Sequence, residues 1–374
     1  MRHIGLRFFL FLFIILLCTS CAVAPDATPS DAPMATAEAT AAPAVTPEPI
    51  PAVTVLDLSG TPGDAATLMD TLASYSTLES VDLSGWEIPF DMMDTLQQAH
   101  PDTDFIWQFE LLGLPVSSTD TEIDLSNRTV EDYDTLAKAF SYLPNLTYAD
   151  MCYCGVSNED MAALRDSYPA IKFVWMIRVA NWEMRTDTKA FSTGNRKTFE
   201  GGRFLGGSSV VHTEDLEPLK YCTDMIALDI GHMRHVTDIS IVEYLPKLQY
   251  LIIGMCGIKD ITPIGKLSDL VFLETFQNYI YDITPFLNLK NLKYLNCSTN
   301  MFTDIDVLSQ LTQLDRLWII HSRLSNAQIE DLKAALPNCS IMTHGEHSAS
   351  NGWRTGNDAY VEMQRLFNLP AQDQ

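Results

Sequence analysis

The chain has 374 residues, and its 48 acidic residues against 24 Lys and Arg give a formal net charge of −24 at pH 7. This charge argues against binding nucleic acid or anionic lipid through the net electrostatic field, and it favours cationic partners. Two of the eight cysteines, Cys18 and Cys21, lie near the N-terminus. Several of the other six fall at repeated positions, which predicts buried thiols rather than a disulfide framework.

Residues 1–21 have the pattern of a secretion signal. Arg2 and Arg7 precede or flank a run of ten apolar residues, 8–17, which is too short to span a bilayer. Cys21 follows Thr19 and Ser20, and this stretch resembles the bacterial lipobox. The resemblance implies cleavage before Cys21 and lipidation of that residue. Cys18 stands where the lipobox usually has Leu, and an ordinary secretion signal with a chance cysteine is the alternative.

Residues 22–52 have the composition of a linker. Ala, Pro and Thr occupy 22 of these 31 positions, and no aromatic residue is present. Such a segment buries too little apolar surface to offset its ordering entropy, so we predict a disordered tether. At the polyproline rise of about 3.1 Å per residue it reaches up to roughly 90 Å.

Residues 53–185 carry long repeats. "VTVLDLSG" at 53–60 recurs as "LESVDLSG" at 78–85, and a larger duplication matches "DFIWQF" at 104–109 with "KFVWMI" at 172–177. Between these strand-like stretches lie amphipathic runs with helical spacing that end near a proline, such as "DMAALRDSYP". We therefore predict coils that each combine a short strand with a true helix.

An acidic residue recurs at one outward strand position of these coils. Strands lie about 4.8 Å apart, so neighbouring carboxylates repel unless a cation or a basic ligand offsets them. A calcium site or a patch for a basic partner is one hypothesis. The alternative is solvated acids, or acids bonded to Ser59, Ser84 and Ser126; no metal and no cofactor is expected. The acids are Asp57, Asp82, Asp124 and Asp150, and Asp229 follows later in the chain.

Residues 186–224 interrupt the pattern, and we predict an irregular insertion or a distorted repeat there. "FEGGRFLGGSS" is rich in glycine, but it lacks the Lys-Ser/Thr of a phosphate-binding loop.

Residues 225–343 carry a shorter and more regular repeat. Leu or another apolar residue recurs at offsets 0, 3 and 10 of each unit and at offset 5 of most of them, where one unit has Thr275, and offset 8 holds Cys, Asn or Ser. One coil cannot bury its own apolar face, whereas stacked coils form a continuous core. The units begin at Leu248, Leu270, Leu292 and Leu314, a period of 22.

This pattern resembles the leucine-rich repeat, L-x-x-L-x-L-x-x-N/C-x-L, and the "DITP" phrasing of two units is similar to the internalin-type subgroup. The resemblance covers roughly residues 53–343. It implies an α/β solenoid with a curved parallel sheet on the concave side and helices or 3-10 turns on the convex side. It also implies that Asn278 and Asn300 bond main-chain groups of the turn and of neighbouring coils.

Outward positions of these shorter coils carry a row of aromatic residues, and these positions line the concave face in this fold. Rigid aromatic surface is what a recognition site needs. We therefore predict partner binding there; the alternatives are that a flanking loop or tail covers the row, or that the protein self-associates through it. The predicted residues are Tyr250, Phe272, Phe276, Tyr294 and Trp318.

Residues 344–374 leave the repeat, and "DAYVEMQRLFNL" predicts a short capping helix. No established catalytic motif is found, so the protein is not expected to be an enzyme. One alternative is an envelope hydrolase with a site in the 178–215 insertion or in the tail. The other alternative is a self-associating structural spacer of the envelope. The hydrolase site would comprise Arg185, Asp187, Arg203, His344 and His347.

These observations together predict a bacterial surface lipoprotein on the extracellular face of the cell membrane. Its membrane contact is the lipid at Cys21, its partner is a protein or an envelope glycan on the concave face, and nucleic acid is not a partner.

Overall fold

The computed structural model describes residues 53–75, 77–349 and 351–367. They belong to one compact unit, Ala52–Gln374. The signal, Cys21 and the linker 22–52 lie outside the described residues. In the described part of the chain, no helix has both the length and the apolar character that a membrane span requires.

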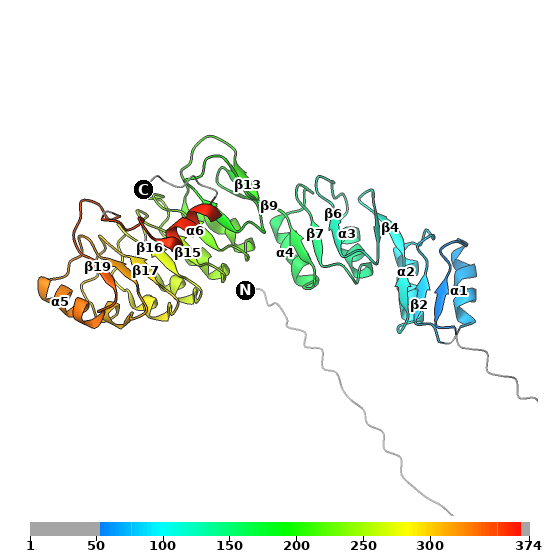
Figure 1. Ribbon diagram of the computed structural model, residues 1–374. Helices are drawn as coiled ribbons and strands as arrows, with labels where there is room; N and C mark the ends of the chain where they lie inside the picture. The colour runs from blue at the N-terminus through cyan, green and yellow to red at the C-terminus, as the bar shows by residue number, and fades with distance from the viewer. Residues whose placement is uncertain (1–52, 76, 350, 368–374) are drawn as a thin grey trace, which may run out of the picture. The chain divides into compact units, whose positions relative to one another are not determined.

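The described residues form a solenoid of coils, each of which begins with a three-residue strand (Figure 1). The strands pair in parallel within three sheets, in chain order. The first sheet contains β1 (Val55–Asp57), β2 (Ser80–Asp82) and β3 (Asp104–Ile106), and the second contains β6 (Glu122–Asp124), β7 (Tyr148–Asp150) and β8 (Lys172–Val174). The third contains β11 (Ala190–Ser192), β14 (Ala227–Asp229), β15 (Tyr250–Ile252), β16 (Phe272–Glu274), β17 (Tyr294–Asn296), β18 (Arg316–Trp318) and β19 (Ser340–Met342).

The segments between strands differ between the two halves, as the coil lengths predict. The longer N-terminal coils hold α1 (Ala65–Ala73), α2 (Phe90–Ala99), α3 (Tyr133–Ala139) with the 3-10 turn η1 (Phe140–Tyr142), and α4 (Asn158–Ser167). The later coils hold the 3-10 segments η2 (Thr213–Tyr221), η3 (Ser240–Tyr244), η4 (Thr262–Lys266), η5 (Thr284–Asn288) and η6 (Leu308–Gln310). The last coil returns to an α-helix, α5 (Asn326–Ala335). The predicted fold class, an α/β leucine-rich repeat solenoid, is confirmed.

Two β-hairpins leave the coils at equivalent places of the duplicated sequence. The first hairpin consists of β4 (Gln108–Leu111) and β5 (Leu114–Ser117), and the second of β9 (Met176–Val179) and β10 (Trp182–Arg185). The base of each is closed alike: the main-chain N–H of Trp107 donates to Ser118 Oγ, and that of Trp175 donates to Thr186 Oγ1, both at 3.2 Å. The duplication is therefore structural, and each residue of the first hairpin has a counterpart at the same place in the second.

The residues 186–224 are more regular than the sequence predicts. β11 begins there as the first strand of the seven-stranded sheet, and η2 forms the turn of the same coil. The Gly-rich part supplies β12 (Thr198–Phe199) and β13 (Gly202–Phe204), and β13 pairs with β10 of the second hairpin. The insertion thus widens the second hairpin into a four-stranded sheet.

The core runs through the stacked coils, and buried asparagines tie each coil to the next. Asn300 Nδ2 donates to the carbonyl oxygens of Thr275 (2.9 Å) and Cys297 (3.1 Å), and its Oδ1 accepts from the N–H of Ile280 (3.2 Å). Asn278 makes the same three kinds of contact one coil earlier. The role that the repeat resemblance implied for these amides is confirmed.

Asn300→Ala removes an amide that satisfies three buried main-chain groups in two neighbouring coils. We expect it to lower the free energy of unfolding by about 3 kcal/mol, because each buried group left unsatisfied costs roughly 1–3 kcal/mol. Urea unfolding followed by circular dichroism measures the change. Asn291→Ala is the control, because Asn291 is exposed and makes one bond, to the carbonyl of Ser268. Equal effects of the two substitutions would contradict the role of the buried ladder.

Asp224 connects coils on both sides of the break between the second and third sheets. Its carboxylate accepts from Lys172 Nζ at 2.5 Å and from Lys247 Nζ at 2.6 Å, and Lys189 Nζ lies 3.3 Å away. Hydrogen bonds from Lys172 and Lys247, together with the charges of the lysines, hold the pKa of Asp224 well below its usual range. The ionised form is therefore favoured by the fold.

A lowered pKa makes this contribution pH-dependent. The stability that Asp224 provides is present above its ordinary pKa of 3.8 and is lost as the pH falls below that value. We expect Asp224→Asn to lower the melting temperature at pH 6 and the difference from wild type to shrink as the pH falls below about 4. Differential scanning calorimetry from pH 3 to 7 gives this profile, with the exposed Asp331→Asn as control. A difference that stays constant over this range would overturn the assignment.

Candidate recognition surface

The outward positions of the seven-stranded sheet bring the predicted aromatic row together. Register places Tyr250 beside Phe272 and Phe272 beside Tyr294, on β15, β16 and β17. Trp318 lies on β18 in the neighbouring row, in register with Asn296 of β17. The repeat period alone therefore aligned these side chains correctly.

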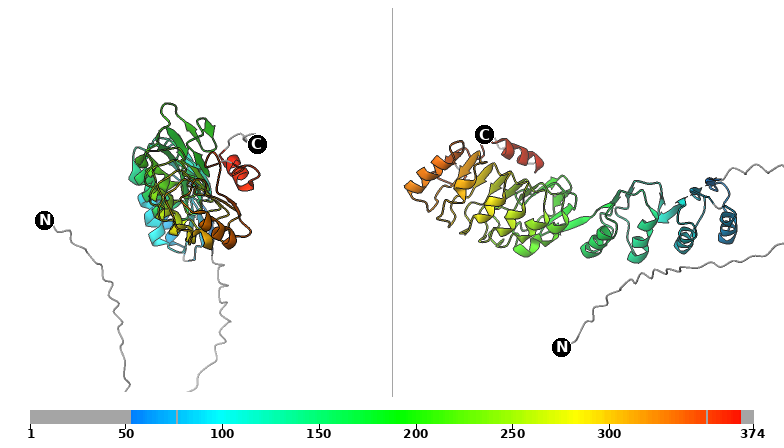
Figure 2. Two further views of the ribbon diagram at one scale, coloured as in Figure 1. Left: turned by 90° about the vertical axis from the view of Figure 1, so that its left-hand side faces the viewer. Right: turned by 90° about the horizontal axis from the view of Figure 1, so that it is seen from below.

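The chain's own C-terminal segment covers this face. Residues 344–367, which we call the C-terminal strap, run over the outward side of the sheet and end in α6 (Asp358–Leu366), on the side opposite the 3-10 segments (Figure 2). Trp353 lies 5.2 Å from both Phe272 and Trp318 between ring centroids, and Tyr360 lies 6.2 Å from Phe272. The strap's contribution to this apolar cluster is Trp353, Tyr360, Met363 and Phe367.

The expectation of an exposed aromatic row is wrong, and the alternative that a tail covers it is confirmed. Phe272 is 0% exposed, Trp318 3%, Phe276 6% and Tyr250 8%, and Tyr294 is half-buried. The physical reason is that the row and the strap both remove apolar surface from water by packing together, at about 1.5–3 kcal/mol for each large side chain. A role of these five residues in partner binding stays a prediction.

A buried ion pair fixes the strap on the sheet. Glu274 is fully buried and accepts from Trp353 Nε1 (2.6 Å) and from Arg354 Nη2 (2.9 Å) and Nε (3.2 Å). The guanidinium of Arg354 also lies over the ring of Tyr360, at 5.0 Å from its centroid. Burial alone would lower the pKa of Arg354, but the charge of Glu274 and its hydrogen bonds raise it overall. Arg354 therefore keeps its positive charge where the strap meets Glu274.

Hydrogen bonds extend this attachment along the strap. Arg316, which continues the aromatic row on β18, donates to the carbonyl oxygens of four strap residues, at 3.1, 3.3, 3.0 and 2.7 Å. Asn296 donates to the carbonyl of Ser348 at 2.9 Å, and Asn195 donates to that of Phe367 at 3.1 Å. The predicted helix is confirmed, but it lies on the outward face of the sheet. The four carbonyl acceptors of Arg316 are Gly352, Trp353, Thr355 and Gly356.

We expect Arg354→Met to destabilise the protein by about 3–5 kcal/mol, because it leaves the buried Glu274 carboxylate without its cation. The double substitution with Glu274→Gln should recover part of this loss. Urea unfolding measures stability, and limited proteolysis at the strap reports whether it has left the sheet. The control is Arg365→Met, because Arg365 is in the same segment and its side chain is 75% exposed. An Arg354→Met effect no larger than the control's would contradict the importance of the pair.

The acidic row of the N-terminal coils closes turns. Each carboxylate accepts from the main-chain N–H two residues later, at 2.9–3.0 Å, where the chain leaves the strand. The alternative of serine-bonded acids is thus confirmed for Asp57, Asp82 and Asp124, whose partners are the predicted serines. Within residues 53–75, 77–349 and 351–367, no three His, Cys, Asp or Glu side chains are grouped as metal ligands.

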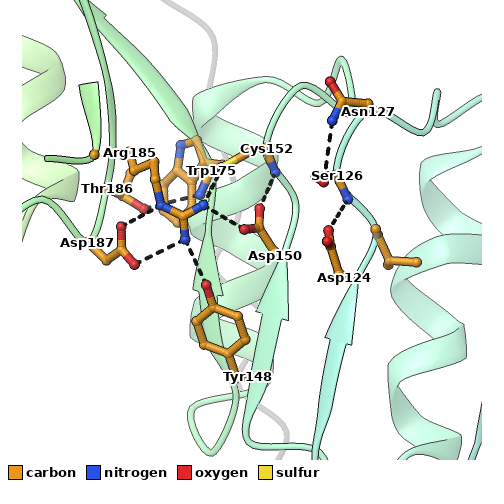
Figure 3. A network of polar contacts seen from close by, with 12 residues as sticks. Asp124, Ser126, Asn127, Tyr148, Asp150, Cys152, Trp175, Arg185, Thr186 and Asp187 are labelled. Carbon is orange, nitrogen blue, oxygen red and sulfur yellow. Dashed lines mark hydrogen bonds and ion pairs between the residues drawn. The ribbon is translucent and has the colours of Figure 1, made fainter. Parts of the chain in front are cut away.

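One acid of this row has a cation from the chain itself (Figure 3). Arg185, at the end of the second hairpin, donates to Asp150 Oδ2 at 2.6 Å, to Asp187 Oδ1 at 2.9 Å and to the Tyr148 hydroxyl at 2.7 Å. Burial alone would raise the pKa of Asp150, but hydrogen bonds from Cys152 and Arg185 lower it overall. The second hairpin thus places Arg185 at the outward face of the sheet, where it neutralises the charge of Asp150.

The residues of the hydrolase alternative fall into separate contact groups. Arg185 and Asp187 belong to the network of Figure 3, whereas Arg203 donates to Glu183 Oε1 at 3.1 Å. His344 lies in the strap, where its Nδ1 is 3.3 Å from the hydroxyl of Thr343. The exposed His347 lies three residues further along the strap. In the described part of the chain, these contacts do not join Arg185, Arg203 and His344 into one site.

The six described cysteines are free thiols, as predicted, and five of them are buried while Cys339 is partly exposed. Cys154 and Cys256 take the turn position that Asn278 takes elsewhere, and each Sγ–H donates to a carbonyl of the preceding coil, at 3.0 and 3.3 Å. Burial raises the pKa of Cys256 to about 12. These thiols therefore serve packing.

Sequence reasoning missed the residues that decide this face, namely Glu274, Trp353 and Arg354. One signal was available: Glu274 is a charged residue at an outward position between Ile252 and Asn296, and the tail holds an adjacent Trp and Arg. A buried carboxylate requires a cation, so a Trp-Arg pair outside the repeat was the candidate to cover it.

The repeated coils and sheets define the class of protein: a leucine-rich repeat solenoid. No protein-family model matches the chain, and no curated protein matches it. Solved structures similar to it include an internalin, inlF, from Listeria monocytogenes, at 22% sequence identity and a TM-score of 0.36, covering 75% of this chain and 65% of that one. The chain thus spans slightly less than two thirds of that internalin's length.

Two further structures are similar to parts of the chain. The functional domain of InlJ from Listeria monocytogenes has 18% identity and a TM-score of 0.31, with 65% of this chain and 51% of that one covered. A leucine-rich repeat protein of Leptospira interrogans has 14% identity and a TM-score of 0.29, with 72% and 74% covered.

Proposed function

We propose that this chain is a non-catalytic recognition protein of the cell surface that binds a protein partner through the outward face of its N-terminal strands. A lipid at Cys21 anchors it to the extracellular face of the membrane, and the linker 22–52 extends it from there. The signal pattern and the composition of the linker support the location. Envelope glycan is the alternative class of partner.

The observation that carries this proposal is that the chain covers one part of its outward surface and leaves another part open. The strap buries the outward positions of β15 to β18. In the N-terminal sheets the outward side chains of Asp57, Asp104, Glu122 and Asp124 are exposed. A partner thus reaches these acids of β1, β3 and β6 without displacing any described segment, whereas the five aromatic residues are accessible to it only if the strap leaves.

The exposed acids favour a cationic partner. The chain twice satisfies outward acids of its own with arginine, as Arg185 does for Asp150 and Arg354 does for Glu274. Guanidinium groups suit this role because they donate several hydrogen bonds to carboxylates in a fixed geometry. A partner that presents Lys or Arg to Asp57, Asp82 and Asp124 would repeat the same chemistry between two proteins.

The combined substitution Asp57→Asn, Asp82→Asn and Asp124→Asn tests this proposal. Asparagine keeps the acceptor oxygen that closes each turn but removes the charge, so the fold should persist. With residues 52–374 as bait in a pull-down from the parent cell envelope, we expect binding of the recovered partner to weaken about tenfold, or about 1.4 kcal/mol. Biolayer interferometry at two salt concentrations measures the affinity and its electrostatic part.

The matched control changes three exposed acids elsewhere, Asp102→Asn, Glu214→Gln and Asp331→Asn, with the same loss of charge. A partner that binds both triple variants equally well would refute the assignment to the outward strand face.

A further inference from the structure

We infer that a cleft under the first hairpin binds a protein segment that presents an aromatic ring beside an arginine or lysine. This inference deepens the proposed function and rests on it, because it supplies the chemistry of one contact with the protein partner. The cleft lies between the turn that follows β2 and strands β4 and β5, and has a volume of about 650 Å³.

The floor of the cleft is apolar and rigid. Trp86, Ile88 and Phe109 line it, and Trp86 is held by its Nε1–H, which donates to the carbonyl of Leu58 at 2.9 Å. Phe109 packs edge-on against Phe90, with ring centroids 5.2 Å apart. Because these walls are already ordered, an entering ring gains contact area with little further loss of side-chain entropy.

The rim of the cleft is acidic. Glu87 and Glu110 are the charged residues that line it, both are exposed, and none of the lining residues is basic. A cation placed beside an aromatic ring would therefore meet opposite charge at the rim, while the ring occupies the floor.

The second hairpin provides the counterpart, and there the chain fills the equivalent place itself. By the duplication that matches 104–109 with 172–177, Gly85 corresponds to Tyr153, and Pro115 to Glu183. The Tyr153 hydroxyl donates to Glu183, and Arg203 Nη2 donates to the same carboxylate oxygen at 3.1 Å. A phenol ring and a guanidinium thus meet on one glutamate.

The first hairpin lacks both of these groups. A side chain at Gly85 is excluded, because its Cβ would lie 1.9 Å from the carbonyl oxygen of Ser59. Strand β13, which carries Arg203 to the second hairpin, has no counterpart, since β4 and β5 form a two-stranded sheet. The cleft is therefore the open version of a site that the chain completes elsewhere with Tyr and Arg.

The occupant inserts side chains and does not add a strand. The outer edge of β5 is a poor template for strand addition, because Pro115 has no N–H and the N–H of Ser117 already donates to Asp120 Oδ2 at 2.7 Å. The chain's own linker is not complementary either, because residues 22–52 contain neither a basic nor an aromatic residue. A partner segment with both features fits this chemistry.

The experiment uses fluorescein-labelled peptides with the core Ser-Arg-Tyr-Arg-Ser as probe, together with matched Ser-Glu-Tyr-Glu-Ser and Ser-Arg-Ala-Arg-Ser peptides. Fluorescence anisotropy measures their binding to residues 22–374 at low salt. We expect the Arg-Tyr-Arg probe to bind at least fivefold more tightly than either matched peptide. Two variants should each weaken it at least fivefold: Glu87→Gln with Glu110→Gln, which removes the rim charge, and Pro115→Trp, which fills the mouth.

The control variant is Glu79→Gln with Asp102→Asn, which removes the same charge outside the cleft and should leave affinity unchanged. The inference is overturned if the Arg-Tyr-Arg probe fails to bind at 1 mM, if either matched peptide binds equally well, or if neither cleft variant weakens binding. It is also overturned if residues 52–374 bind the probe at least fivefold more tightly than residues 22–374, because the linker then occupies the cleft.

These outcomes separate the cleft from the proposed function. If the triple Asp→Asn variant loses partner binding but the cleft does not bind the probe, only the assignment of the cleft is refuted. Probe binding in the cleft, with no effect of the triple variant on the partner, would instead remove the strand face as the recognition surface.

Discussion

The structure depends on one constraint: no coil can bury its own apolar face, so every coil requires its neighbours. Short parallel strands with alternating side chains satisfy this constraint, since inward residues such as Leu251, Leu273 and Leu295 align in register and are completely buried. The buried asparagines and cysteines at the following turn then form hydrogen bonds with main-chain groups that stacking would otherwise bury without a partner. The buried aliphatic residues and the side chains that hydrogen-bond the buried main chain thus recur with the same period.

The same alternation creates an outward face, and the chain treats that face differently along its length. Over β15 to β18 most outward residues are large and apolar, and the strap covers this face with an aromatic cluster and a buried ion pair. Over β1 to β7 they include many acids, and much of this face is exposed. The residue types at the outward positions therefore distinguish two surfaces: one that packs against the chain's own strap, and one that is available to a partner.

The two hairpins show how a duplicated unit acquires different chemistry. Their bases are closed by the same tryptophan and hydroxyl contacts. The second hairpin gained strand β13 and with it Arg203, and its outward acid Asp150 is neutralised by Arg185. The first hairpin has serine at the position of Arg185 and no added strand, so its acids and its cleft face solvent.

The sequence by itself determined the coils, their period, the helices of the long repeats, the 3-10 segments of the short ones, the free buried thiols and the turn-closing acids. These features are local or repeat at a fixed interval, so a pattern of residue types is enough to predict them. It also aligned Tyr250, Phe272 and Tyr294 on one face.

Only the tertiary structure decided that this face is closed. The strap is remote from Glu274 along the chain, and no periodic pattern in the sequence predicts the contact between Arg354 and Glu274. A row of outward aromatic residues looks the same in sequence whether a partner or the chain's own tail removes it from water, because burial depends on which distant surface gains most by covering it. The cleft under the first hairpin is likewise a product of packing between segments, and the duplication reveals it only once the filled counterpart is seen.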